Sequence, residues 1–202
     1  MKRRILGYVA VVATVICLCA APSFAADNYK IGVGYQGLIA GNMLNGLSVR
    51  GWFGPNTAIG VEGNVFYGSM KGDVSVTNSV FAADANAKLW MIELKAMYAF
   101  LVRQNSRFYA GGKIAYGQYD GNAGYMGVDV GELKGKLIIP GILVGAEWNF
   151  PSLPELGFNF EVGYNYVISK NTASSPMEPG YDVDIDLKMH GINVGAGIKY
   201  YF

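Results

Sequence analysis

The sequence lacks three features that would place it in common classes of protein. Charged residues make up 15% of its 202 residues, whereas a soluble domain carries about 25%. Beyond residue 25, no apolar run reaches the roughly 20 residues that a transmembrane helix needs. The two cysteines, Cys17 and Cys19, lie near the N-terminus, so the rest of the chain can form no disulfide. Low charge without a spanning helix indicates a membrane barrel, in which apolar residues alternate along strands.

The N-terminal residues have the pattern of a secretory signal peptide. Three basic residues, 2–4, precede an apolar run over residues 5–21, and both cysteines fall inside this run. Residues 23–25, Ser-Phe-Ala, then place small residues at positions −3 and −1 of a cleavage site after Ala25. We therefore predict a cleaved signal peptide over residues 1–25 and one outer-membrane β-barrel domain over residues 26–202.

From Tyr29 to the last residue, apolar side chains alternate with polar side chains or glycine. In one such stretch, Phe160 and Val162 fall on one face and Asn159 and Glu161 on the other. A period of two is the pattern of a β-strand that faces two different environments. We expect eight strands, at residues 29–37, 46–53, 57–67, 88–100, 107–117, 136–150, 156–168 and 187–202.

The connections between these strands alternate in character, as outer-membrane barrels require. Short turns are expected at 54–56, 101–106 and 151–155. On the opposite side we expect a short outer loop near 38–45 and long, polar outer loops near 68–87, 118–135 and 169–186. Because lipid offers no hydrogen bonds, only a closed sheet can satisfy its backbone there. The predicted fold class is therefore all-β, an eight-stranded antiparallel up-and-down transmembrane β-barrel. Pro140 lacks a backbone donor, so we expect an interruption of strand pairing around it.

The polar face of the predicted strands carries glycine and single charged residues. An eight-stranded barrel is just wide enough for its own side chains to fill it, and buried charges persist only when paired. We therefore predict a network of ion pairs that plugs the interior, in which Lys199 neutralises Glu161. By alternation this network contains Arg50, Glu62, Glu93, Lys95, Lys113, Glu147, Glu161 and Lys199. A soluble, lipocalin-type barrel is the alternative, but its outer face would need more charge than this sequence supplies.

The chain ends in Gly-Ile-Lys-Tyr-Tyr-Phe, an alternating pattern in which Tyr200 and Phe202 share one face. This ending resembles the C-terminal signal by which the outer-membrane assembly machinery recognises barrels. Residues 27–202 as a whole resemble the OmpA-like/OmpX-like outer-membrane β-barrel domain superfamily. The resemblance implies the Gram-negative outer membrane as location, with the assembly machinery and outer-membrane lipid, including lipopolysaccharide, as partners. The periplasmic domain of full OmpA proteins is expected to be absent.

Candidate residues for chemistry are few. Residues 32–37 match the glycine pattern of dinucleotide-binding loops, but no helix follows to hold a phosphate. His190 is the single histidine and lacks the serine two residues later that lipid A deacylases have. Asp182, Asp184 and Asp186 alternate in the last outer loop and are a weak candidate for binding a divalent cation. We predict no catalytic residues, no cofactor and, in the absence of a basic patch after residue 25, no nucleic-acid partner.

These observations favour a structural or surface-interaction protein, whose extracellular loops contact surface ligands. A narrow, porin-like channel for small solutes is the first alternative, and a lipid A-modifying enzyme is the second. The state of the barrel interior separates the first two, because a plugged lumen cannot conduct.

Overall fold

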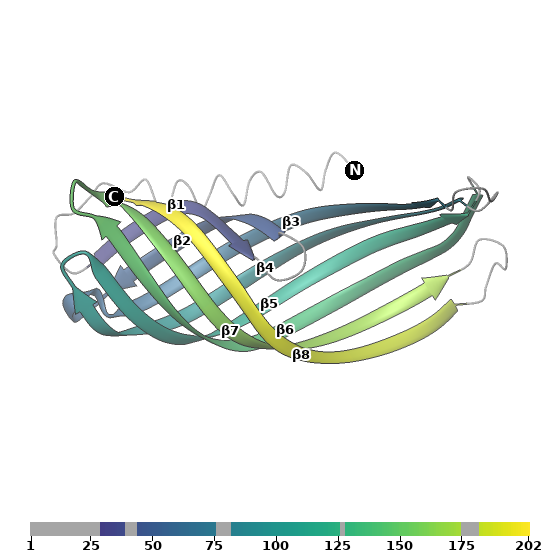
Figure 1. Ribbon diagram of the computed structural model, residues 1–202. Coiled ribbons are helices and arrows are strands. Elements are labelled where there is room, and N and C mark those ends of the chain that lie inside the picture. Colours follow the sequence, from purple (N-terminus) through teal and green to yellow (C-terminus); the bar gives the residue numbers. More distant parts are fainter. Residues whose placement is uncertain (1–28, 39–43, 76–81, 126–127, 175–181) are drawn as a thin grey trace, which may run out of the picture.

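The structure, a computed structural model, describes residues 29–38, 44–75, 82–125, 128–174 and 182–202. The predicted cleavage site and both cysteines lie outside these residues. Each strand is antiparallel to the next along the chain, and β8 pairs with β1 to close a barrel (Figure 1). The predicted eight-stranded antiparallel barrel is confirmed. In the part of the chain that the structure describes, no helix is long and apolar enough to span a membrane.

The strands differ greatly in length, and one short 3-10 helix follows β2. The elements are β1 (Tyr29–Leu38), β2 (Leu44–Phe53), η1 (Pro55–Thr57), β3 (Ile59–Ser75), β4 (Ala82–Arg103), β5 (Ser106–Tyr125), β6 (Val128–Phe150), β7 (Leu153–Ser174) and β8 (Asp182–Tyr201).

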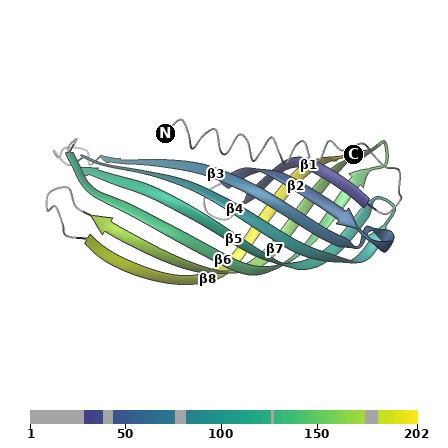
Figure 2. The same cartoon turned by 180° about the vertical axis from the view of Figure 1, so that it is seen from behind.

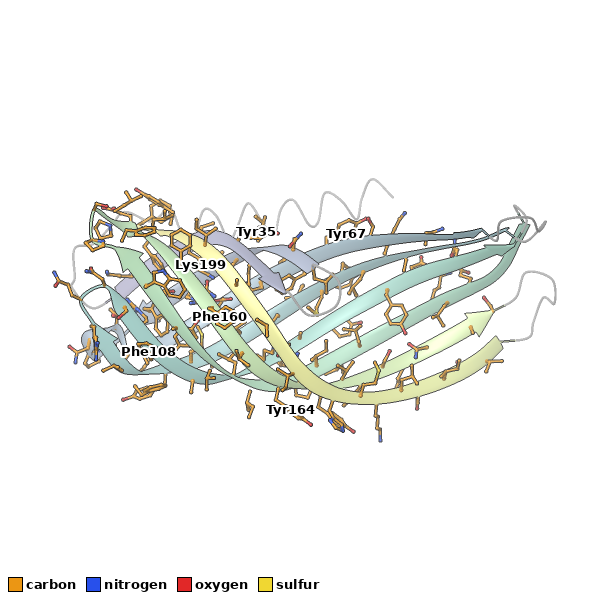
Figure 3. All side chains as sticks on the ribbon, in the orientation of Figure 1. Tyr35, Tyr67, Phe108, Phe160, Tyr164 and Lys199 are labelled. Carbon is orange, nitrogen blue, oxygen red and sulfur yellow. The ribbon has the colours of Figure 1, made fainter. Side chains whose placement is uncertain are left out.

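Side chains alternate between the two faces of the barrel wall, as the period of two predicts. On β6, Ile142 is 67% exposed on the outer face, whereas its neighbour Leu143 is buried inside. Aromatic side chains flank the outer apolar surface, and Phe108 and Tyr164 point away from the barrel (Figure 3). Exposed apolar residues between aromatic girdles are the outer surface that lipid requires.

Six of the eight strands continue far beyond the other two. β1 ends at Leu38 and β2 starts at Leu44, whereas β3 to β8 extend together past this level (Figures 1 and 2). The ladders run as far as Ser75–Ala82 between β3 and β4 and Ser174–Asp182 between β7 and β8. We call this six-stranded part the outer extension.

The outer extension corrects the prediction of long outer loops at 68–87, 118–135 and 169–186, most of which is strand. Strand pairing persists there because the backbone hydrogen bonds do not depend on which residues face outward. On β8 the alternation changes faces: the odd positions of residues 183–189 are apolar and have the parity of the inner face, while the outward positions are polar. The pattern of apolar residues on the outward face therefore stops where the strand leaves the membrane.

Pro140 interrupts pairing on one side of β6. The ladder between β6 and β7 stops at Ile138–Ile168 and resumes at Gly141–Asn165. On the other side Pro140 still lies opposite Ile114 of β5. Proline has no backbone N–H, so the predicted interruption appears on the side where a donor is missing.

The closing seam between β1 and β8 depends on a glycine on the inner face. A Cβ atom added at Gly34 would lie 1.9 Å from the backbone oxygen of Ile198. We expect Gly34→Ala to lower the free energy of unfolding by about 1–3 kcal/mol, the usual cost of overpacking. Urea unfolding of the protein folded into lipid vesicles measures this. Gly191→Ala is the control, since a Cβ there meets no atom within 4 Å, and an equal effect of both changes would contradict the steric explanation.

Candidate functional site

Three layers of side chains fill the barrel interior along its axis. The central layer is ionic and is bounded by two apolar layers, one toward the short turns and one toward the outer extension. The inward faces of all eight strands meet in this space because each strand contributes every second residue. The interior is the part of the molecule where charged side chains are brought together, so we take it as the candidate functional site.

Arg50 of β2 lies at the centre of the ionic layer and is fully buried. Its guanidinium donates to Glu62 on the neighbouring strand, to Glu147 Oε2 at 2.8 Å and to Glu161 Oε1 at 2.6 Å. It also donates to the hydroxyl of Tyr109 at 3.1 Å. This one side chain of β2 thus contacts groups from β3, β5, β6 and β7. Arginine suits this role because its planar guanidinium holds five N–H donors in fixed directions.

Lys95 of β4 is the second cation at the centre. Its Nζ atom donates to Glu62 Oε1 at 2.9 Å and to Glu161 Oε2 at 2.5 Å, and it lies 3.4 Å from Glu93 Oε1. Glu93 in turn pairs with Lys113 of β5 at 3.1 Å. The chain of pairs continues from the centre toward the outer end of the lumen, so burial of each charge is compensated by an opposite charge.

The predicted pairing of Lys199 with Glu161 is wrong. Lys199 Nζ donates instead to Gln36 Oε1 and Asn159 Oδ1, both at 2.9 Å, and lies 3.6 Å from Glu62 Oε2. Glu161 is neutralised by Arg50 and Lys95, which reach it across the lumen. In a narrow barrel, long side chains from distant strands meet as readily as those of adjacent strands.

A cluster of apolar side chains lies on each side of the ionic layer. Toward the turns lie Trp52, Met97, Ala99, Tyr109, Leu143 and Tyr201. Toward the outer extension lie Phe66, Met91 and Ala115, packed by the partly buried Leu44, Leu137 and Ile139. Tyr109 and Tyr201 connect the turn-side apolar layer to the ionic layer. Their rings pack in the apolar layer. The hydroxyl of Tyr109 donates to Glu161 Oε1 at 2.8 Å, and the hydroxyl of Tyr201 donates to Glu147 Oε2 at 2.6 Å.

The structure brings all eight residues of the predicted network together and adds one cation that the sequence analysis missed. Arg107 is 7% exposed, lies 3.4 Å from Glu147 Oε1 and has its guanidinium carbon 4.5 Å from the centre of the Trp52 ring. A signal for it was present, because Arg107 has the parity of Tyr109 on the inner face of β5. The expected turn at 101–106 placed Arg107 at the strand end, where burial was not anticipated.

The remaining candidates whose side chains the structure describes lie outside the lumen. His190 is exposed, and its Nδ1 atom is 2.6 Å from the hydroxyl of Tyr164 on the outer face. Asp184 accepts a hydrogen bond from Thr172 Oγ1 at 3.0 Å, and Asp186 lies opposite Lys170. Among the described residues, no group of three or more His, Cys, Asp or Glu residues is placed to hold a metal ion. The cation site at Asp182, Asp184 and Asp186 stays a prediction.

The C-terminal residues complete the closing strand. Tyr200 and Phe202 are both exposed on the outer face, with ring centres 5.3 Å apart. The backbone N–H of Phe202 donates to the oxygen of Ile31 at 2.9 Å, which ties the chain end to β1. The two predicted assembly-signal residues are therefore adjacent side chains on the barrel exterior, and their recognition by assembly machinery stays a prediction.

A closed barrel with an apolar outer band and a charged interior is the arrangement seen in bacterial outer membranes. The family model described as outer membrane protein β-barrel domain matches residues 10–202. The chain belongs to this family. Its location is therefore the Gram-negative outer membrane, and the resemblance to small outer-membrane barrels is confirmed. The comparison with curated proteins finds no match.

Solved structures of this family's fold are similar to the chain over most of their length. A major outer membrane protein from Thermus thermophilus is 12% identical with a TM-score of 0.61, and the alignment covers 86% of this chain and 99% of that protein. The outer membrane protein OprG from Pseudomonas aeruginosa is 15% identical with a TM-score of 0.56, covering 88% and 96%. At these identities the similarity concerns the fold alone.

Proposed function

We propose that this protein is a sealed, non-enzymatic outer-membrane barrel that presents the outer extension as a surface for interaction outside the cell. The observation that carries the proposal is the three-layered interior, in which paired charges lie between apolar layers. The outer extension supports the second half of the proposal, because six strands continue beyond the closed barrel. The proposal includes export through a cleaved signal peptide over residues 1–25 and assembly through the C-terminal residues Tyr200 and Phe202.

Filled layers oppose ion flow for two physical reasons. An ion entering the centre would have to displace charges that already satisfy one another, such as Arg50 with Glu62, Glu147 and Glu161. An ion entering either apolar layer would lose its water without gaining new ligands, which is costly. A narrow channel is the alternative function, and the same interior would then have to open.

We expect no steady single-channel current when the purified protein is inserted into planar lipid bilayers. An open porin measured in the same membranes is the positive control for detection. Folding and insertion are verified by the change in electrophoretic migration that outer-membrane barrels show on heating. A steady current in the wild type that increases in Glu93→Ala or Lys113→Ala would contradict the proposal and favour a channel lined by these side chains.

A further inference from the structure

A groove crosses the outer face of β4 to β8 at the base of the outer extension. Its volume is about 1050 Å³, and it is lined by Lys88, Lys134, Lys136 and Lys170. All four lysines are exposed and have the same parity along their strands as outward residues such as Ile92 and Ile138. The groove therefore lies on the side of the wall that faces away from the lumen. We call it the basic groove.

The height of the basic groove places it at the edge of the membrane. Ile138 and Ile168 lie opposite each other on β6 and β7. Lys136 and Lys170 are the next outward-facing residues on these strands, two residues closer to the outer end. Two residues of strand span about 7 Å. The eleven residues from Ile138 to Trp148 on a tilted strand fit an apolar band about 25 Å tall. The lysines thus begin where the band ends, at the level of lipid headgroups.

Charges in the basic groove are unevenly distributed. Lys136 lies directly opposite Lys170, and Gln118 is its neighbour on the other side. Like charges directly opposite on adjacent strands destabilise a sheet unless a counter-charge is near. Among the described residues, neither lysine has a carboxylate within 4 Å, whereas Lys134 pairs with Glu132 at 2.5 Å. That hydrogen bond also raises the pKa of Lys134.

The acidic residues of the groove lie to the sides of this lysine pair. Asp120 lies opposite both Lys88 and Lys134. On β8, Asp186 lies opposite Lys170, and Asp184 lies opposite Thr172. The excess positive charge is therefore centred on Lys136, between β5 and β7, and polar side chains surround it. This arrangement suits a ligand that has an anionic group and several hydroxyl groups.

We propose that the basic groove binds the headgroup of a phosphorylated glycolipid of the outer leaflet, with Lys136 and Lys170 on one phosphate. Lysine binds phosphate as a point charge, and lysines at a membrane surface attract anionic lipids. The acyl chains of such a lipid would lie against Ile138, Ile168 and the apolar band below them. The groove exceeds the size of a phosphate alone and has room for sugar rings. The inference goes beyond the surface role proposed above and does not depend on a closed lumen.

The test uses the folded, full-length protein in detergent micelles and measures the binding of diphosphoryl lipid A by titration calorimetry. We expect the double variant Lys136→Gln, Lys170→Gln to bind about 25-fold more weakly, from roughly a fivefold contribution of each surface lysine. Monophosphoryl lipid A is expected to lose affinity for the wild type. Inorganic phosphate and phosphatidylglycerol are added separately, to distinguish a glycolipid from free phosphate and from other anionic lipids.

A matched control removes two positive charges at the opposite end of the barrel. Lys30 and Arg103 are exposed there, and the double variant Lys30→Gln, Arg103→Gln should bind lipid A as the wild type does. The proposal is overturned if both double variants bind equally well, or if phosphatidylglycerol binds as tightly as lipid A. It is also overturned if millimolar inorganic phosphate displaces lipid A, because a free anion would then be the ligand.

Discussion

Replacing Arg50 by methionine is expected to lower the free energy of unfolding by about 3–5 kcal/mol, the range measured when one partner of a buried ion pair is removed. Methionine keeps much of the side-chain volume, so the decrease in the free energy of unfolding arises mainly from removal of the positive charge. Without the guanidinium, Glu147 loses a contact at 2.8 Å and, among the described residues, keeps only Arg107 at 3.4 Å as a cationic partner. Glu161 loses a contact at 2.6 Å and keeps Lys95, and both carboxylates remain buried. Urea unfolding from lipid vesicles, followed by tryptophan fluorescence, measures the change.

Two further variants separate charge from simple removal of an arginine. Arg103→Met at the exposed end of β4 should change stability by about 0.5 kcal/mol or less. The double variant Arg50→Met, Glu62→Gln should be less destabilised than the sum of its single changes, because it also removes one of the carboxylates that Arg50 neutralises. If Arg50→Met costs no more than Arg103→Met, the ionic layer is not held together by this arginine.

The sequence predicts which side chains face the lumen better than it predicts what they contact there. Alternation alone places Arg50, Glu62 and Lys95 inside, since a one-residue shift would put their charges in lipid. The mistaken pairing of Lys199 with Glu161 came from considering adjacent strands only. In the folded barrel, Glu161 of β7 meets Lys95 of β4 across the interior, and no local pattern encodes that contact.

The positions at which the strands end on the outer side were the second feature that could not be predicted from the sequence. Within the membrane, lipid on one side and protein on the other impose alternation, so the strand cores are visible in the sequence. In the outer extension this constraint disappears, and strands such as β7 continue to Ser174 without an apolar period. The basic groove was missed for the same reason, because its lysines come from four separate segments that were expected to be loops or strand ends.

The placement of the membrane leads to the second large effect, which concerns Ile142 at the middle of the apolar band. Ile142→Arg should lower the free energy of unfolding in a lipid bilayer by about 2–4 kcal/mol, the cost of a lipid-facing arginine at the midplane of a barrel. Ile142 is 67% exposed, so the change removes little protein packing. The penalty arises because lipid, unlike water, cannot solvate the guanidinium.

Ile185 on β8 is the control, since it is an exposed isoleucine of the outer extension whose side chain has the parity of the inner face and so meets no lipid. Ile185→Arg should cost under about 1 kcal/mol, because its side chain meets water whichever lipid surrounds the barrel. Both changes are measured by urea unfolding in the same vesicles. Equal costs at the two positions would mean that Ile142 does not face hydrocarbon, and the apolar band would then have to be covered by protein instead. If Ile142→Arg costs more than Ile185→Arg and this cost decreases in thinner bilayers, Ile142 lies near the middle of the hydrocarbon layer. The reason is that thinning the bilayer brings water closer to the middle of β6.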